Sequence, residues 1–397
     1  MLGAAASGRT RLTNFAPSAD CSSTLDCLGR LGVRVTRDGQ ALVIEGRGWE
    51  GLTAAPDPLD AGNSGSTIRM LSGVLAGRPF TTVLTGDDAL RKRPMERIAA
   101  PLRAMGAQIF TTEGRPPVTI EGGSLSGVRW PLEIPSAQVK TAVLLAGLQA
   151  EGTTAVVEPE PSRDHTERLL PLFGVDVGRT GAAVEVRRHD TLQPVDWAIP
   201  GDVSSAAFFV VAALVLPDSV ARADDVLLNP RRTAFIDVLR EMGADVEMRI
   251  ESESPEPVGW IEARSSRLRG ATIAASLVPS LIDEIPALAV AGAHAEGALS
   301  VTGARELRVK ESDRIAALAE GLARLGADVE ELDDGFVVRG GRPLRGARVR
   351  SHGDHRIAMA LAVAALTASG ETEIEGSECV SVSFPDFFQL LQTGTRG

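Results

Sequence analysis

The chain has 397 residues, 44% of them hydrophobic, and a net charge of −11 at pH 7. This length exceeds what one ordinary hydrophobic core holds, so two domains are expected. The acidic balance argues against a nucleic-acid coat and against an anionic membrane surface, because both attract basic proteins. A small anionic substrate would have to be held by a local group of basic side chains.

The cysteines and the apolar runs bear on where the protein works. Cys21, Cys27 and Cys379 are odd in number and lack metal-site spacing, which fits a reducing cytoplasm. The longest apolar run, 206–216, is too short to span a bilayer. Residues 1–8 lack the basic start and the apolar length of a signal peptide. We therefore expect a cytoplasmic protein without a membrane segment.

A Leu-x-x-x-Gly pattern recurs six times at intervals of roughly 70 residues. Each copy predicts a helix closed by glycine, and a β-like run follows the first five. The glycines are Gly32, Gly106, Gly174, Gly243, Gly326 and Gly394. The pattern predicts an α/β (α+β) fold of six pseudo-repeats, three per domain. Because Pro200-Gly201 separates the third repeat from the fourth, the predicted domains are residues 1–199 and 200–397.

Small-residue stretches between these turns predict buried helices, because Ala and Gly allow close packing in a layered core. The stretches are 66–75, 137–148, 204–214, 287–294 and 355–366. Residues 63–67 precede the first of them with small residues whose free N–H groups suit an anion. An ordinary N-cap loop has the same composition, so both interpretations stay open.

The densest charge lies in residues 305–314, before another apolar helical pattern. Helical spacing predicts Lys310 and Arg314 on one face with Glu311 beside them. Two cations four residues apart repel, and a bound phosphate or carboxylate would relieve that cost. A solvated helix start with charge pairs is the alternative.

Lysine is scarce, since only Lys92, Lys140 and Lys310 occur among 41 basic residues. A retained lysine suggests a place that needs a compact ammonium, or one able to release a proton.

Asp283 precedes a predicted buried helix, where a carboxylate serves as a cap or as a general base. The sequence has no phosphate-binding Gly-x-x-x-x-Gly-Lys-Ser/Thr loop and no Gly-x-Ser-x-Gly elbow. His352 and His355 do not make a zinc site, and a helix start explains both.

The motifs together resemble those of the 5-enolpyruvylshikimate-3-phosphate synthases, in the family's order and over essentially the whole chain. The stretches that carry the resemblance are Asn63-Ser64-Gly65-Ser66-Thr67-Ile68-Arg69, Lys92-Arg93-Pro94-Met95, Ser136-Ala137-Gln138-Val139-Lys140, Ser162-Arg163-Asp164-His165, Gly201-Asp202-Val203-Ser204-Ser205, Leu307–Arg314 and Asp354-His355-Arg356. The Ser-Ala-Gln and Leu-Arg-Val-Lys-Glu-Ser variants resemble its second class.

The resemblance implies a two-domain inside-out α/β barrel and transfer of enolpyruvyl from phosphoenolpyruvate to the 5-hydroxyl of shikimate 3-phosphate. It implies no cofactor and no metal. For catalysis it implies Asp283 as base, Glu311 for proton transfer at the methylene carbon, and Lys310 near the same centre. The residues implied for shikimate 3-phosphate are Ser136, Ala137, Gln138, Arg163, Asp283 and Lys310. Those implied for phosphoenolpyruvate are Asn63, Gly65, Arg93, Gln138, Arg314 and Arg356.

The start of the chain departs from the family, which begins with a strand and a Gly-Asp-Lys-Ser-x-Ser-His-Arg loop. Residues 1–8 match the helix after that loop, with Gly8 as its expected end. We therefore expect that a Lys-Ser-x-Ser-x-Arg peptide is needed in trans, as a partner for full activity of an otherwise monomeric enzyme.

Two alternatives stay open. A related transferase acting on a UDP-sugar has a reactive cysteine in its first domain, and residues 111–117 contain none. A catalytically dead homologue that binds shikimate 3-phosphate or a partner is the other.

Overall fold

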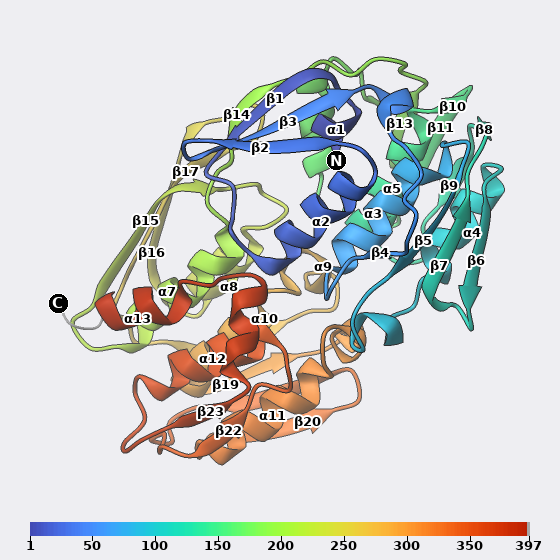
Figure 1. Cartoon of the computed structure of the whole chain (residues 1–397). Coiled ribbons are helices and arrows are strands. Elements are labelled where there is room, and N and C mark those ends of the chain that lie inside the picture. The colour runs from blue at the N-terminus through green and yellow to red at the C-terminus, as the bar shows by residue number, and fades with distance from the viewer. Residues whose placement is uncertain (395–397) are drawn as a thin grey trace. The chain divides into compact units, whose positions relative to one another are not determined.

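A computed structural model describes residues 1–394. The chain divides into two compact units at the boundary between Ile199 and Pro200. Each unit has its own hydrophobic core, and the residues of one core all lie within one unit. Each unit is described by itself below (Figure 1).

The first unit combines six helices with fourteen strands. Its helices are α1 (Leu2–Ala5), α2 (Ala19–Arg30), α3 (Gly65–Ala76), α4 (Glu96–Ala104), α5 (Ala137–Gly147) and α6 (His165–Leu169). Its strands are β1 (Ser7–Thr13), β2 (Arg34–Asp38), β3 (Ala41–Arg47), β4 (Leu59–Asp60), β5 (Thr81–Thr85), β6 (Gln108–Thr112), β7 (Arg115–Glu121), β8 (Leu125–Ser126), β9 (Arg129–Pro131), β10 (Ala150–Glu151), β11 (Thr153–Val157), β12 (Gly178–Thr180), β13 (Ala183–Arg187) and β14 (Asp196–Ala198).

The second unit uses the same kinds of element. Its helices are α7 (Val203–Val215), α8 (Ala234–Glu241), α9 (Val278–Leu281), α10 (Ile285–Ala293), α11 (Arg314–Arg324), α12 (His355–Ala365) and α13 (Phe387–Gly394). Its strands are β15 (Val220–Leu227), β16 (Asp245–Ser252), β17 (Val258–Arg264), β18 (Arg269–Ile273), β19 (Glu296–Val301), β20 (Asp328–Leu332), β21 (Gly335–Arg339), β22 (Arg348–Arg350) and β23 (Glu373–Glu375).

One sheet topology recurs and makes the pseudo-repeats visible. The four-stranded sheets β4-β5-β7-β6, β9-β11-β13-β12 and β18-β19-β21-β20 each combine one parallel pair with two antiparallel pairs. The sheet β14-β1-β3-β2 has the same order, but its parallel strand β14 comes from the end of the unit. The fold is thus a mixed α/β fold built from repeated units.

The predicted small-residue helices are α3, α5, α7, α10 and α12, and nearly all of their residues are buried. In the first unit α3 packs against α5, and in the second α7, α10 and α12 pack against one another. Sheets flank these helices (Figure 1), so helices form the interior of each unit. The sheets of the described residues are open and do not close into a barrel.

The glycine turns follow the prediction in five repeats. Gly32, Gly106, Gly174, Gly243 and Gly326 all have positive φ, the conformation that ends a helix. The sixth glycine, Gly394, is itself the last residue of α13.

The expected helix end at Gly8 is also wrong. Helix α1 ends at Ala5, and Gly8 lies in β1, where it pairs with Gly46 of β3. Pairing with β3 therefore takes the chain out of the helix earlier than the glycine indicated.

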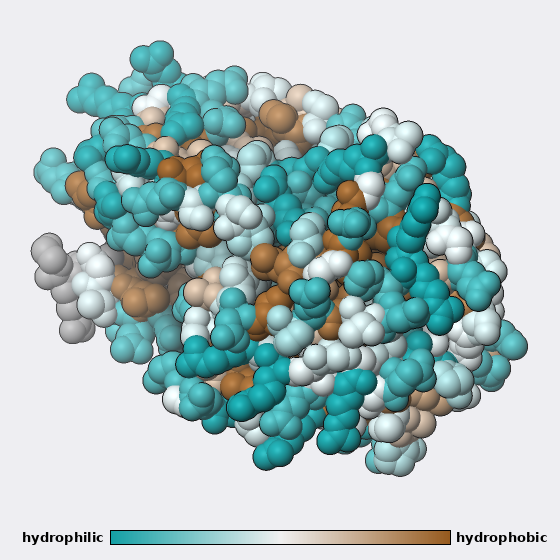
Figure 2. Space-filling model, turned by 90° about the horizontal axis from the view of Figure 1, so that it is seen from above, coloured by the Kyte–Doolittle hydropathy of each residue, from teal (hydrophilic) through white to brown (hydrophobic). Residues whose placement is uncertain are grey.

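The face of the molecule in Figure 2 is mainly hydrophilic, and hydrophobic residues reach it in a few groups. Among the described residues, none of the helices has both the length and the apolar character needed to cross a membrane.

Candidate active site

The predicted residues of the second unit gather around Arg314, the first residue of α11. Its side chain is 1% exposed, and its Nε donates to Asp354 Oδ2 at 2.8 Å. Its other nitrogens donate to Glu311 Oε2 at 2.6 Å and Asp283 Oδ1 at 3.3 Å. Burial lowers the pKa of Arg314, but the three carboxylates outweigh burial and raise it. Arg314 is therefore a permanent buried cation.

Asp283 lies at the centre of this cluster. Lys310 Nζ is 3.7 Å from its Oδ1, and Arg356 Nη1 donates to its backbone carbonyl at 2.8 Å. Two cationic side chains thus lie beside the Asp283 carboxylate and a third holds the backbone of the same residue, an arrangement that keeps a candidate general base in place.

The predicted shared helix face of Lys310 and Arg314 is wrong. Residues Arg305–Val309 form a 3₁₀ turn, and Lys310 has extended backbone. Asp313 is the N-cap of α11, and its Oδ1 accepts from Ala316 N at 3.1 Å. Because an N-cap is not helical, the helix starts after the lysine. Carboxylates of the protein, rather than two cations on one helix, surround Arg314.

Sequence reasoning missed a polar network beside Asp283. Arg232 donates to Asp202 Oδ1 at 2.9 Å and to Ser204 Oγ at 2.5 Å. Ser204 Oγ in turn donates to the carboxylate of Glu284. Burial raises the pKa of Glu284, although the charge of Arg232 opposes this. The Gly201–Ser205 motif pointed to this place, but no pattern marked Arg232.

His355 is the first residue of α12, as the helix-start interpretation predicted. Its side chain is buried, and burial together with the charge of Arg356 lowers its pKa to about 4. The imidazole is therefore neutral at pH 7.

In the first unit, two guanidinium groups lie over the start of α3. A Cβ built on Gly65 would lie 2.9 Å from Arg93 Nη1 and 3.1 Å from Arg69 Nη1. Both arginines are buried, and Arg93 Nη2 donates to Asn63 Oδ1 at 2.9 Å. Ser64 caps the helix by accepting from Thr67 N at 3.2 Å. A helix N-terminus with two arginines and no Cβ is suited to a phosphate or carboxylate.

The start of α5 connects to the same place. Ser136 is its N-cap, Ala137 its first residue, and Gln138 Oε1 accepts from Arg69 Nη1 at 2.6 Å. Gln138 Nε2 donates to Ser66 Oγ at 2.9 Å. Arg69 was named in a motif but not predicted as a site residue, and its position beside Gly65 and Gln138 makes it a candidate.

Arg163 is half-buried in the loop between β11 and α6. Its neighbour Ser162 is buried and bonded to Glu158, so the loop has a fixed attachment in the unit.

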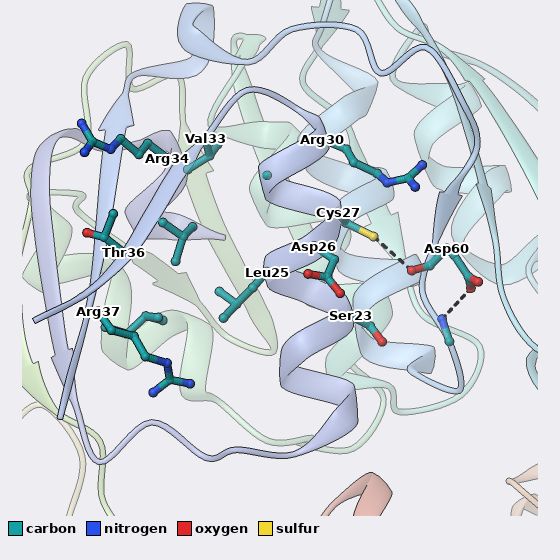
Figure 3. A pocket seen from close by; sticks show the side chains of 14 residues that line it. Ser23, Leu25, Asp26, Cys27, Arg30, Val33, Arg34, Thr36, Arg37 and Asp60 are labelled. Carbon is teal, nitrogen blue, oxygen red and sulfur yellow. Dashed lines mark hydrogen bonds between the residues drawn. The ribbon is translucent and has the colours of Figure 1, made fainter. Parts of the chain in front are cut away.

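A separate cavity of about 910 Å³ lies between α2 and the strand β2 (Figure 3). Cys27 Sγ donates to Asp60 O at 3.4 Å in its wall, and burial raises the pKa of this thiol to about 11. The cavity wall contains none of the predicted site residues.

The EPSP synthase (3-phosphoshikimate 1-carboxyvinyltransferase) family matches residues 1–391. The chain belongs to this family.

Its relatives include the 3-phosphoshikimate 1-carboxyvinyltransferases of Desulforudis audaxviator strain MP104C and Salinibacter ruber strain DSM 13855 / M31, 51% and 52% identical. These matches cover 99% and 98% of this chain and 92% of each relative. The EPSP synthase structure from Acinetobacter baumannii is similar at a TM-score of 0.87 and 44% identity, covering 99% of this chain and 92% of that one.

Proposed function

We propose that the chain transfers the enolpyruvyl group of phosphoenolpyruvate to the 5-hydroxyl of shikimate 3-phosphate and releases phosphate. The proposal rests on family membership and on one observation above all. The carboxylate of Asp283, a candidate base, is held by Arg314 at 3.3 Å and by Lys310 at 3.7 Å. Addition to an enol ether needs such a base, together with a proton donor for the other carbon.

In the proposed mechanism Asp283 takes the proton of the 5-hydroxyl group while the oxygen of that hydroxyl attacks C2 of phosphoenolpyruvate. Glu311 gives a proton to C3 and takes one back as phosphate leaves, so that the double bond re-forms. Lys310 contributes positive charge near the reacting centre.

Substrate binding is assigned by charge. The start of α3 is the proposed anion site, and it contains Asn63, Gly65 and Arg93. Phosphoenolpyruvate is proposed to bind to these three residues together with Gln138, Arg314 and Arg356. Shikimate 3-phosphate is proposed to bind to Ser136, Ala137, Gln138, Arg163, Asp283 and Lys310. We add Arg69 to the phosphoenolpyruvate group, because it lies beside Arg93 over Gly65.

The test is phosphate release from the two substrates, with the product identified by mass. Asp283→Asn is expected to lower kcat by at least about 100-fold, the usual contribution of a general base. Asp237→Asn is the matched control, because that carboxylate is 79% exposed on α8 of the same unit. Equal activity of the two variants would contradict the assigned base.

The same assay, run with and without a peptide carrying the family's first strand and Lys-Ser-x-Ser-x-Arg loop, tests the expected need for that segment. Turnover by the chain alone would contradict that expectation. Shikimate 3-phosphate binding without turnover in either arm would favour the dead homologue. The cytoplasmic location and the monomeric state stay predictions, the second open to analytical ultracentrifugation.

A further inference from the structure

Lys140 is one of the three lysines and the one whose side chain is fully buried together with two carboxylates. It lies on α5, and its Nζ is 2.8 Å from Glu158 Oε2 and 2.8 Å from Glu167 Oε1. Taking such charges out of water is costly, and apolar replacements of similar volume are often as stable. Stability alone is therefore a weak explanation for this trio.

The trio connects two segments that the proposed function assigns to the same substrate. Glu158 Oε1 accepts from Ser162 N at 3.1 Å and also from the Ser162 hydroxyl. Ser162 directly precedes Arg163, while Lys140 lies one helical turn after Ser136 on α5. The ammonium thus joins the start of α5 to the loop that carries Arg163.

A second link holds the far end of the same segment. Glu167 is buried in α6, and the neighbouring Thr166 Oγ1 lies 2.5 Å from Thr141 Oγ1 of α5. The segment from Glu158 to Glu167 is therefore attached to α5 at both ends, and Arg163 lies between the two attachments.

We propose that Lys140 is a positioning residue for shikimate 3-phosphate. Its ammonium holds the segment 158–167, and with it Arg163, at a fixed place relative to Ser136 and Gln138. The inference rests on the proposed function for the identity of the ligand. The compact ammonium lies 2.8 Å from an oxygen of each carboxylate, and the longer planar guanidinium of arginine would need a different geometry to bridge them. This explains why a chain so rich in arginine keeps a lysine here.

Arg78 provides the matched control for a merely structural role. It is a buried cation of the same unit, and it donates to Gln149 Oε1 at 2.9 Å and Glu50 Oε1 at 3.1 Å. None of these three residues belongs to the proposed site. Lys140→Met and Arg78→Met each remove one buried cation and leave its partners in place.

Calorimetric titration with shikimate 3-phosphate, together with hydrogen exchange, tests the proposal. Both variants should lower the unfolding temperature. Lys140→Met should weaken binding at least tenfold and remove exchange protection of residues 158–167. Arg78→Met should stay within twofold of wild type. Equal affinities of the two variants would overturn the positioning role.

If Lys140→Met does not fold, Ser162→Ala is the second test, because it removes the hydroxyl bond to Glu158 and keeps the backbone bond. A threefold or greater loss of affinity is expected, and unchanged affinity overturns the proposal. If the wild-type chain does not bind shikimate 3-phosphate even with the Lys-Ser-x-Ser-x-Arg peptide present, the proposed function fails instead. Hydrogen exchange still judges the positioning role in that case, since unchanged protection of 158–167 in the folded variant contradicts it.

Discussion

The absent side chain of Gly65 leaves space below Arg93 and Arg69 at the start of α3, where we propose that an anion binds. Gly65→Ala places a methyl carbon 2.9 Å from Arg93 Nη1, closer than real Cβ contacts, so the guanidinium must shift. We expect the KM for phosphoenolpyruvate to rise several-fold, measured by steady-state kinetics. Gly29→Ala is the control, because a Cβ there meets no atom within 4 Å. An unchanged KM in Gly65→Ala would remove this glycine from the binding site.

By resemblance, glycine at position 65 also points to inhibition by glyphosate. We expect wild-type protein to be inhibited, and Gly65→Ala to be less sensitive, because the methyl group narrows the same anion site. The measurement is the inhibition constant against phosphoenolpyruvate. A wild-type constant far above the KM for phosphoenolpyruvate contradicts the expectation.

His355 makes stability depend on pH. Its pKa is about 4 in the folded protein, against 6.5 for a free side chain. Between these values the unfolded chain binds more protons, so the free energy of unfolding falls as pH drops from 6.5 to 4. The loss is about 3 kcal/mol. Denaturant melts at several pH values should show a smaller decrease in His355→Gln than in the half-exposed control His352→Gln.

At the scale of residues, the sequence predicted which charged residues form the cluster better than it predicted which residues they bond to. Lys310, Glu311 and Arg314 were found by their charge density, yet Arg314 bonds to Asp283 and Asp354, which are 31 and 40 residues away. Arg232 was missed because its role comes from Ser204 and Asp202, 28 and 30 residues away. Such pairs depend on how helices meet, and no local pattern records that.

At the scale of elements, the contact between α3 and α5 depends on Gly73. A Cβ there would lie 2.0 Å from the backbone oxygen of Ala142, so the helices approach closely enough for their backbones to touch. Gly73→Ala must push α3 and α5 apart, and we expect a loss of about 2–3 kcal/mol of unfolding free energy. Gly29→Ala on α2 should be neutral or stabilising by up to about 1 kcal/mol. Chemical denaturation measures both.

The buried helices were predicted well, because a continuous run of small apolar residues marks a buried helix within one segment of the sequence. The expected 137–148 and 355–366 correspond to Ala137–Gly147 and His355–Ala365. Gly394 differs from the other five glycines, because it is itself the last residue of its helix, α13. The order of strands in the sheet that contains β1 was not predictable. Its strand β14 pairs with β1 although nearly the whole sequence of the first unit separates the two.

At the scale of the whole molecule, the separate cores predict separate responses to mutation. Phe387 is fully buried and has ring contacts with four phenylalanines of the second unit. Phe387→Ala is expected to cost about 3–5 kcal/mol. Gly73→Ala acts on the first unit only. Monitored by circular dichroism and tryptophan fluorescence, each variant should shift a different part of the unfolding curve. Identical shifts would mean that the two units unfold as one.

The pairing of β14 with β1 also has a consequence for biosynthesis. Thr10 and Val195 are bonded across 185 residues, and Arg11 lies opposite Asp196. At the usual 5–20 residues per second, the ribosome needs about 10 to 40 s to make the intervening chain. During that time one edge of β1 has no partner, and it is open to pairing with another nascent chain. The sheet around β1 is thus completed only after nearly the whole first unit has been made, and we expect misassembly between nascent chains during that interval.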